Sequence, residues 1–273
     1  MKKMIAWMLT GLLVTGMLCG AAAADNGKEE IITGPNGDIY GVLQVPETDK
    51  AVPLIILSHG FGGNHTFSQD YADYFTAQGF AVYNFDFCGG GYGSRSSGTM
   101  MDMSVLTEAD DLNTVIDHFR NDSRFSSILL WGASQGGFVS AYVSALRPDD
   151  VKAVVLEFPA IVLQDDSEAR RREDGTFPET VSIMGVKVSG KYDIDATSFD
   201  LYDVIGQYTG PVLILHGDKD PIVPIRYSER AAEVYENDQL IVMPGQGHGF
   251  MGSARTEAME REASFFTAMS ETY

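Results

Sequence analysis

The chain has 273 residues and a formal net charge of −19, and 44% of its residues are hydrophobic and 21% charged. This length and composition are those of a globular protein with a substantial core, which excludes a disordered or low-complexity chain. The acidic excess repels nucleic-acid phosphate and anionic lipid headgroups, so we expect neither as a partner. The two cysteines, Cys19 and Cys88, are too few for a disulfide framework or a four-cysteine metal site.

Residues 1–24 have the pattern of a secretory signal peptide. Two lysines precede an apolar run over residues 4–18, and small residues follow it. This run is shorter than the about 20 residues that a membrane-spanning helix needs. We therefore expect cleavage after Ala24 and a secreted or periplasmic protein without stable membrane insertion. A lipoprotein anchor at Cys19 is the weaker alternative, because Leu18 stands where a small residue is expected.

After the signal peptide, short β-branched runs alternate with helical patterns. Strands are predicted at residues 38–45, 52–57, 81–87, 127–131, 153–158, 212–216 and 239–243. Helices are predicted at residues 67–78, 105–119, 135–146, 225–235 and 255–269. Several strands are apolar without alternation, as in strands that are covered on both faces. The alternation of strands and helices predicts a doubly wound, mostly parallel α/β sheet.

The connection between residues 158 and 211 is much longer than a crossover helix needs. It contains three successive arginines at residues 170–172 and a hairpin-like segment over residues 181–192. Because ligands of open α/β sheets bind beyond the carboxyl ends of the strands, we expect residues 160–197 to form a cap over the site. The chain has no internal repeat and no Pro-rich linker, so residues 25–273 are predicted to form one domain with an insertion.

The segment Gly132-Ala133-Ser134-Gln135-Gly136 has the Gly-x-Ser-x-Gly pattern of a nucleophile elbow. It lies directly between a predicted apolar strand and a predicted helix, which is the setting that such an elbow requires. Glycines at its flanks allow the close backbone approach of a tight turn. Ser134 is therefore the candidate nucleophile. The alternative is a glycine-rich turn with an incidental serine.

A serine hydroxyl needs an adjacent base, and His248 is the best placed of the five histidines. It follows the last predicted strand in a glycine-rich loop, from which an imidazole can reach back to Ser134. Asp218 and Asp220 both follow the preceding strand and could orient this imidazole. Asp220 is preferred, because it directly precedes the segment Pro221-Ile222-Val223-Pro224 that enters the next helix, whereas Asp218 is expected to shape the turn. The order Ser134, Asp220, His248 is that of α/β-hydrolases.

An acyl-transfer site also needs donors for the oxyanion. The backbone N–H of Gln135, directly after the nucleophile, is one candidate. The other is the backbone N–H of Phe61, in the glycine-rich segment after the strand at residues 52–57. Other glycine-rich segments lack the spacing of a nucleotide-binding motif, and no metal-ligand pattern occurs in the sequence. We therefore expect neither a cofactor nor a metal.

On these residues the chain resembles α/β-hydrolase serine esterases over nearly all of its length after residue 24, and more narrowly bacterial feruloyl (cinnamoyl) esterases. The segments that carry the resemblance are His59-Gly60-Phe61-Gly62-Gly63-Asn64, Gly132-Ala133-Ser134-Gln135-Gly136-Gly137, Phe158-Pro159-Ala160, Tyr202-Asp203-Val204 and His216-Gly217-x-x-Asp220.

The resemblance implies an α/β-hydrolase fold with a cap insertion after the sixth strand. It further implies a Ser-His-Asp esterase that releases ferulic or p-coumaric acid from plant cell-wall esters through an acyl-enzyme. In such esterases a polar pair in the cap can bind the ring hydroxyl of the substrate, and matching the cap places Asp166 and Tyr192 at these positions.

Three other functions remain open at this point. A general carboxylesterase or acylglycerol lipase would use the same triad with a different pocket. A serine aminopeptidase is disfavoured, because we find no separate N-terminal specificity domain. A catalytically silent binding protein is disfavoured because Ser134, Asp220 and His248 are all present. The expected substrate is a small-molecule or polysaccharide-linked ester, and the oligomeric state is left open.

Overall fold

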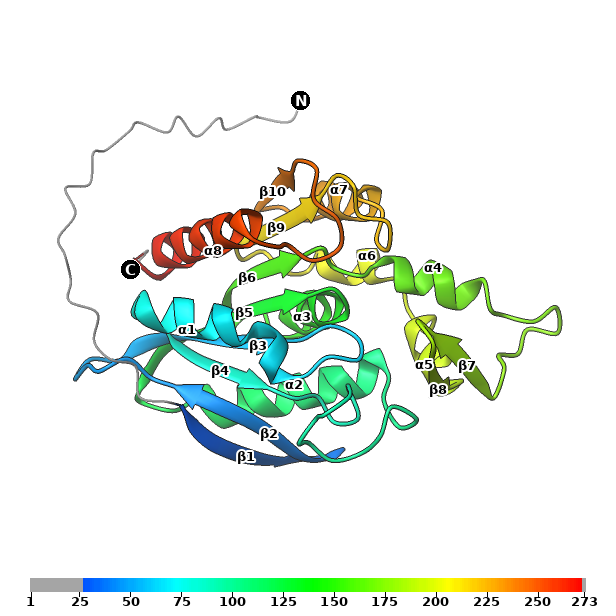
Figure 1. The fold of residues 1–273 in the computed structure, drawn as a ribbon, viewed down its shortest axis with the longest axis horizontal. Coiled ribbons are helices and arrows are strands. Elements are labelled where there is room, and N and C mark those ends of the chain that lie inside the picture. The colour runs from blue at the N-terminus through cyan, green and yellow to red at the C-terminus, as the bar shows by residue number, and fades with distance from the viewer. Residues whose placement is uncertain (1–26, 272–273) are drawn as a thin grey trace.

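The computed structural model describes residues 27–271, and an eight-stranded sheet runs through its centre (Figure 1). The strand order is β1-β2-β4-β3-β5-β6-β9-β10. The pairs β1/β2 and β2/β4 are antiparallel, and all the other neighbours are parallel. The prediction of a doubly wound, mostly parallel α/β sheet is confirmed. The expected signal peptide, residues 1–24, and Cys19 lie outside the described residues.

The strands of this sheet are β1 (Lys28–Gly34), β2 (Gly37–Gln44), β3 (Val52–Ser58), β4 (Ala81–Phe85), β5 (Phe125–Ala133), β6 (Val151–Glu157), β9 (Val212–Gly217) and β10 (Asp238–Met243). The seven predicted strands are all present, each within two residues of its predicted ends. The sequence pattern missed β1. Within the sheet this edge strand pairs only with β2, and most of its residues are exposed, so it lacks the continuous apolar run of the central strands.

Helices cover both faces of the sheet. They are α1 (Gln69–Ala77), α2 (Val105–Phe119), α3 (Gln135–Leu146), α4 (Val162–Glu168), α5 (Lys191–Ala196), α6 (Leu201–Ile205), α7 (Arg226–Val234) and α8 (Ser253–Glu271), with a short 3-10 helix η1 (His65–Ser68) before α1. α1 and α8 pack on one face, and α2, α3, α6 and α7 pack on the other. No helix within residues 27–271 combines the length and the apolar character that crossing a bilayer requires.

Helix α2 shows how the sequence determines these elements. Ser104 caps its first turn in a capping box with Thr107. Leu112, Val115 and Ile116 recur at helical spacing and are fully buried against the sheet. The helix therefore forms over the predicted residues.

The cap follows β6, the sixth strand in the chain, and comprises α4, the hairpin of β7 (Thr180–Ile183) and β8 (Val186–Ser189), and α5. It projects beyond the carboxyl ends of β5 and β6 (Figure 1). The hairpin ends before α5 begins at Lys191, so it is shorter than the predicted hairpin-like segment. Arg170 forms an ion pair of 2.7 Å with the fully buried Asp193, which ties the end of α4 to α5. One of the three successive arginines thus stabilises the cap.

Candidate active site

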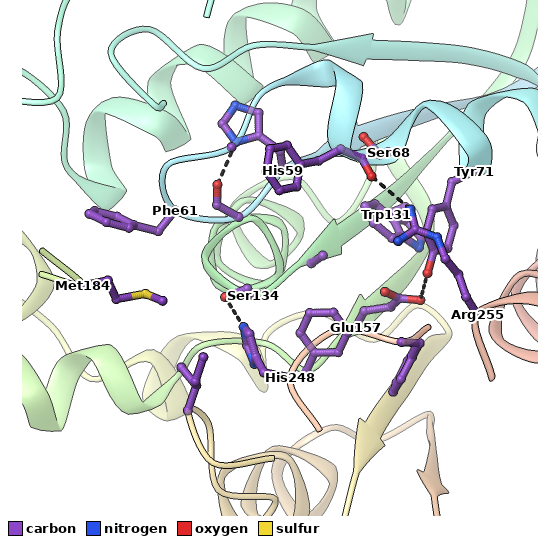
Figure 2. A pocket seen from close by; sticks show the side chains of 18 residues that line it. His59, Phe61, Ser68, Tyr71, Trp131, Ser134, Glu157, Met184, His248 and Arg255 are labelled. Atoms are coloured by element: carbon purple, nitrogen blue, oxygen red, sulfur yellow. Dashed lines mark hydrogen bonds between the residues drawn. The ribbon is translucent and has the colours of Figure 1, made fainter. Parts of the chain in front are cut away.

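Ser134 occupies a sharp turn between β5 and α3. Its backbone has φ 55° and ψ −120°, a conformation that is rare for a residue with a side chain and that costs energy. A Cβ atom at Gly132 would lie 2.3 Å from the carbonyl oxygen of Gly136, and one at Gly136 would lie 2.1 Å from that of Ser58. Both glycines are therefore required for the turn, which directs the Ser134 hydroxyl into the site (Figure 2).

The structure brings the three predicted triad residues together. His248 Nε2 lies 3.0 Å from Ser134 Oγ, and His248 Nδ1 lies 2.8 Å from Asp220 Oδ2. Asp220 Oδ1 accepts hydrogen bonds from the backbone N–H groups of Ile222 and Val223 at 2.8 and 2.9 Å, which fix the carboxylate plane. The resulting chain can move a proton from the serine to the imidazole while the carboxylate stabilises the cation that forms.

The surroundings of Asp220 keep it ionised. Burial alone would raise the pKa of Asp220, but hydrogen bonds from His216, His248 and the backbone of Val223 hold it well below its ordinary value. The second candidate carboxylate, Asp218, instead accepts a hydrogen bond of 2.6 Å from the backbone N–H of Gly245. Asp218 thereby holds the loop that carries His248, and it does not contact the imidazole ring.

The two backbone N–H groups that we expect to bind the oxyanion have no acceptor among the described residues. Gln135 begins α3, so its N–H has no acceptor within the helix. Within residues 27–271, the N–H of Phe61 also has no acceptor. His59 Nδ1 donates 2.8 Å to the carbonyl oxygen of Gly60, and its Nε2 accepts from the N–H of Phe87, which fixes the loop before Phe61 (Figure 2). Burial lowers the pKa of His59, in agreement with a neutral ring that both donates and accepts.

Ser134 and His248 open into a cavity of about 290 Å³. Its volume is near the lower end of the about 300–1,000 Å³ of typical ligand pockets. Most of its wall is apolar and largely aromatic, including Phe61, Trp131, Phe158, Met184, Ile222 and Phe250. The cavity therefore suits a small, flat group.

Phe158 is a site residue that the sequence analysis did not identify. Its ring packs edge-on against the His248 imidazole, with 4.7 Å between ring centroids. Its backbone has φ 36°, in the left-handed region, at the point where the chain leaves β6 for the cap. Pattern analysis placed Phe158 at the opening of the insertion but could not reveal the contact with His248, which lies 90 residues further along the chain.

The expectation that Asp166 and Tyr192 bind substrate from the cap does not match the structure. Asp166 is exposed on α4, and neither side chain lines the cavity at Ser134. Tyr192 is buried, and its hydroxyl donates a hydrogen bond of 2.7 Å to Oε1 of Gln135. The cap contributes Met184 instead, because the turn between β7 and β8 extends toward the cavity while α5 packs against the main domain (Figure 2).

The sequence analysis also missed a cluster of polar side chains at one end of the cavity. Glu157, Tyr71 and Arg255 line it there, and the Tyr71 hydroxyl donates 2.7 Å to Glu157. The available signal was an acidic residue at the end of an otherwise apolar predicted strand. Among the described residues, no group of three His, Cys, Asp or Glu side chains is arranged to hold a metal ion.

Comparison with protein families gives two adjoining matches. Residues 49–195, more than half of the chain, match the family described as serine aminopeptidase, S33, and residues 196–269 match the family described as TAP-like protein. Among curated proteins, the chain is 27% identical over 255 residues to a monoacylglycerol lipase of Mycolicibacterium smegmatis. This match covers 77% of the chain and 85% of the lipase.

Solved structures of esterases and lipases share the fold. Est1E from Butyrivibrio proteoclasticus with bound ferulic acid superposes with a TM-score of 0.80 at 24% identity, covering 88% of this chain and 98% of Est1E. A monoacylglycerol lipase of Paleococcus ferrophilus superposes with a TM-score of 0.68 at 19% identity, covering 85% of this chain and 99% of the lipase. With its mostly parallel sheet and cap, and with more than half of its length matched, the chain belongs to the α/β-hydrolase family described as serine aminopeptidase, S33.

Proposed function

We propose that this protein is a carboxylic-ester hydrolase that forms an acyl-enzyme on Ser134. The observation that carries the proposal is the hydrogen-bonded chain from Ser134 through His248 to Asp220, in a cavity that Phe61 also lines. A nucleophile, a base, a carboxylate that orients the base and oxyanion donors are the parts that acyl transfer requires. The exported form is expected to act without a cofactor.

In the first half of the reaction, Ser134 Oγ attacks the ester carbonyl and His248 Nε2 takes its proton. The oxyanion of the tetrahedral intermediate accepts hydrogen bonds from the N–H groups of Phe61 and Gln135. His248 then returns the proton to the leaving alkoxy oxygen, and the alcohol departs. In the second half, His248 takes a proton from water, the hydroxide attacks the acyl carbon, and the acid leaves as Ser134 regains its proton.

We propose hydroxycinnamic esters of plant cell-wall polysaccharide as the natural substrates. The cavity is small and its walls are largely aromatic, which suits a flat cinnamoyl group better than a long acyl chain. The fold of the ferulic-acid complex of Est1E supports the same choice.

An acylglycerol lipase is the second candidate, because large apolar side chains surround the mouth of the cavity. Phe67 and Met184 both line it and are 68% and 70% exposed. An apolar rim of this kind could bind an acyl chain or a lipid surface. The monoacylglycerol lipase of Mycolicibacterium smegmatis supports this alternative at 27% identity.

Steady-state hydrolysis of three substrates distinguishes these functions. We expect methyl ferulate to give the highest kcat/KM, glyceryl monodecanoate a lower one, and alanine p-nitroanilide none. A preference for glyceryl monodecanoate would establish the lipase. Hydrolysis of the anilide, without hydrolysis of either ester, would contradict the proposal and indicate the aminopeptidase activity that the family description names.

We further propose that the protein is exported, on the pattern of residues 1–24. The test is expression of the full chain in a bacterial host, followed by fractionation and N-terminal sequencing. We expect the exported protein to begin at Asp25. Retention in the cytoplasm with residues 1–24 intact would contradict export.

A further inference from the structure

One end of the cavity is polar, whereas the rest of its wall is apolar. Glu157, Tyr71 and Arg255 meet there, on the far side of Ser134 from Met184 (Figure 2). Only 2% of Glu157 is exposed, and its Oε1 accepts the hydrogen bond from Tyr71. The acyl-enzyme chemistry uses none of these side chains. The reaction at Ser134 therefore does not explain why a buried carboxyl group lies at the wall of the cavity.

The position of Glu157 follows from the register of the sheet. Glu157 on β6 pairs with Ala133 on β5, and Val155 pairs with Trp131. Side chains alternate along a strand, so Trp131, Ala133 and Glu157 lie on the same face of the sheet. This is the face that α1 and α8 cover, and these helices supply Tyr71 and Arg255. The strand next to the nucleophile thus carries a carboxyl group into the substrate cavity.

Glu157 keeps spare capacity to accept hydrogen bonds. Burial raises the pKa of Glu157 to about 7, although the hydrogen bond from Tyr71 and the charge of Arg255 oppose this rise. Burial and the charge of Glu157 raise the pKa of the neighbouring Glu262 well above its ordinary value, and neither carboxyl oxygen of Glu262 has a hydrogen-bond partner among the described residues. A carboxylate offers about four acceptor positions, and the Tyr71 hydroxyl fills one of them.

The chemistry of this end of the cavity selects among ligand groups. The negative charge of Glu157 would repel a ligand carboxylate, and the positive charge of Arg255 would repel a ligand ammonium group. A neutral hydroxyl can donate to Glu157 without adding charge. The rings of Tyr71 and Trp131, 4.7 Å apart between centroids, and the ring of Phe158 form walls that suit an aromatic group.

We propose that Glu157, oriented by Tyr71, is a specificity-determining residue that accepts a hydrogen bond from the hydroxyl of a hydroxyaryl group on the substrate. This inference rests on the proposed ester hydrolysis at Ser134. It assigns to the main domain the carboxylate and phenol pair that the sequence analysis expected in the cap. A site built to bind a hydroxyl rejects an analogue that lacks it, because the buried acceptor then stays unpaired.

The test compares methyl p-coumarate with methyl cinnamate and with methyl 4-methoxycinnamate, which carries no donor. The readout is the ratio of kcat/KM values within each enzyme, so that a loss of folded protein cancels. At pH 8, above the pKa of about 7 of Glu157, we expect the wild type to favour p-coumarate over both analogues by about 10-fold or more, as for a hydrogen bond to a charged group. Glu157→Met should bring both ratios close to 1.

Two further variants keep the test decisive. Glu157→Gln retains a carbonyl acceptor without its charge, so its ratios should fall at least about threefold even if Glu157→Met fails to fold. Glu260→Met places the same substitution at an exposed position of α8 and should keep the wild-type ratios. Wild-type ratios in the Glu157→Gln enzyme, or equal rates on all three esters in the wild type, would overturn the inference and leave ester hydrolysis intact.

A second substrate pair locates the hydroxyaryl group on the acyl or the alcohol side of the ester. 2-(4-Hydroxyphenyl)ethyl acetate and 2-phenylethyl acetate differ only by a hydroxyl on the alcohol. Discrimination in this pair that depends on Glu157 would support recognition of the alcohol, and discrimination in the cinnamate set would support recognition of the acid. Hydrolysis of none of these esters would refute the proposed function itself, and the inference with it.

Discussion

The Tyr192 hydroxyl in the cap donates a hydrogen bond of 2.7 Å to the side-chain carbonyl of Gln135, the residue directly after the nucleophile. The amide nitrogen of Gln135 in turn donates 2.8 Å to Glu108 on α2. All three side chains are buried, so this chain links the cap to the turn that carries an oxyanion donor. Tyr192 therefore positions Gln135.

Removing this contact should affect the turn and leave substrate choice unchanged. We expect Tyr192→Phe to lower the free energy of unfolding by about 1 kcal/mol, because the carbonyl of Gln135 loses its donor. It should also lower kcat on all esters by up to about 10-fold. The ratio of kcat/KM for methyl p-coumarate to that for methyl cinnamate should remain at the wild-type value. A fall of this ratio toward 1 would show that Tyr192 binds the substrate hydroxyl.

Variants of the nucleophile and base test the triad. Ser134→Ala and His248→Ala should each lower kcat on p-nitrophenyl acetate by about 10,000-fold or more, because the two residues act as a unit. Thermal unfolding followed by circular dichroism should show that both variants fold. The double variant should be no slower than either single one. Additive losses would show that the two residues do not act in the same step.

The two aspartates after β9 should differ sharply. Asp220→Asn should lower kcat by about 10,000-fold, because an amide can hold His248 in the wrong tautomer. Asp218→Asn keeps a carbonyl oxygen that can accept from the N–H of Gly245, so we expect a loss of less than about 10-fold. The kcat values of the two variants on one ester provide the comparison. A larger loss in Asp218→Asn than in Asp220→Asn would show that Asp218 orients His248.

The seven strands predicted from the sequence form because their apolar runs determine burial locally. Helix α2 likewise begins and ends at its predicted residues, and the structure shows that a capping box fixes its start. The edge strand β1 was missed because its exposed residues carry no such pattern. Residue type and order along the chain were also sufficient to nominate Ser134, Asp220 and His248, since a strand-turn-helix and two post-strand loops place them at one edge of the sheet.

The substrate end of the site could not be predicted in this way. The position of the cap depends on tertiary contacts such as the hydrogen bond between Tyr192 and Gln135, which spacing along the chain does not reveal. Glu157 faces the cavity only because α1 and α8, far apart in sequence, cover that face of the sheet. The pattern showed an acidic residue within an apolar strand but not the tyrosine that holds it.

Buried Glu108 should make stability depend on pH. Burial raises the pKa of Glu108 to about 8, against the hydrogen bond from Gln135. Between its unfolded value of about 4.3 and this folded value, the folded state binds more protons than the unfolded state. Stability due to this group is therefore present at low pH and is lost as the pH rises through this window, by up to about 1.4 kcal/mol per pH unit.

The variant Glu108→Gln removes this titration while keeping an acceptor for Gln135. Relative to the wild type, its free energy of unfolding should increase steadily between pH 5 and pH 8. Urea unfolding of both proteins at several pH values measures the difference, and Glu260→Gln on the exposed face of α8 serves as the control. A difference that does not change with pH would show that Glu108 is ionised in the folded protein throughout.

Covalent trapping of the nucleophile tests the acyl-enzyme most directly. The purified protein is incubated with diethyl p-nitrophenyl phosphate, which phosphorylates activated serines, and peptides are mapped by mass spectrometry while ester hydrolysis is followed in parallel. We predict one diethylphosphoryl group per chain, located on Ser134, with activity lost in proportion to its formation, and no adduct in Ser134→Ala. Continued ester hydrolysis with Ser134 unmodified, or an adduct on another residue that accounts for the loss, would contradict the assignment of Ser134 as the nucleophile.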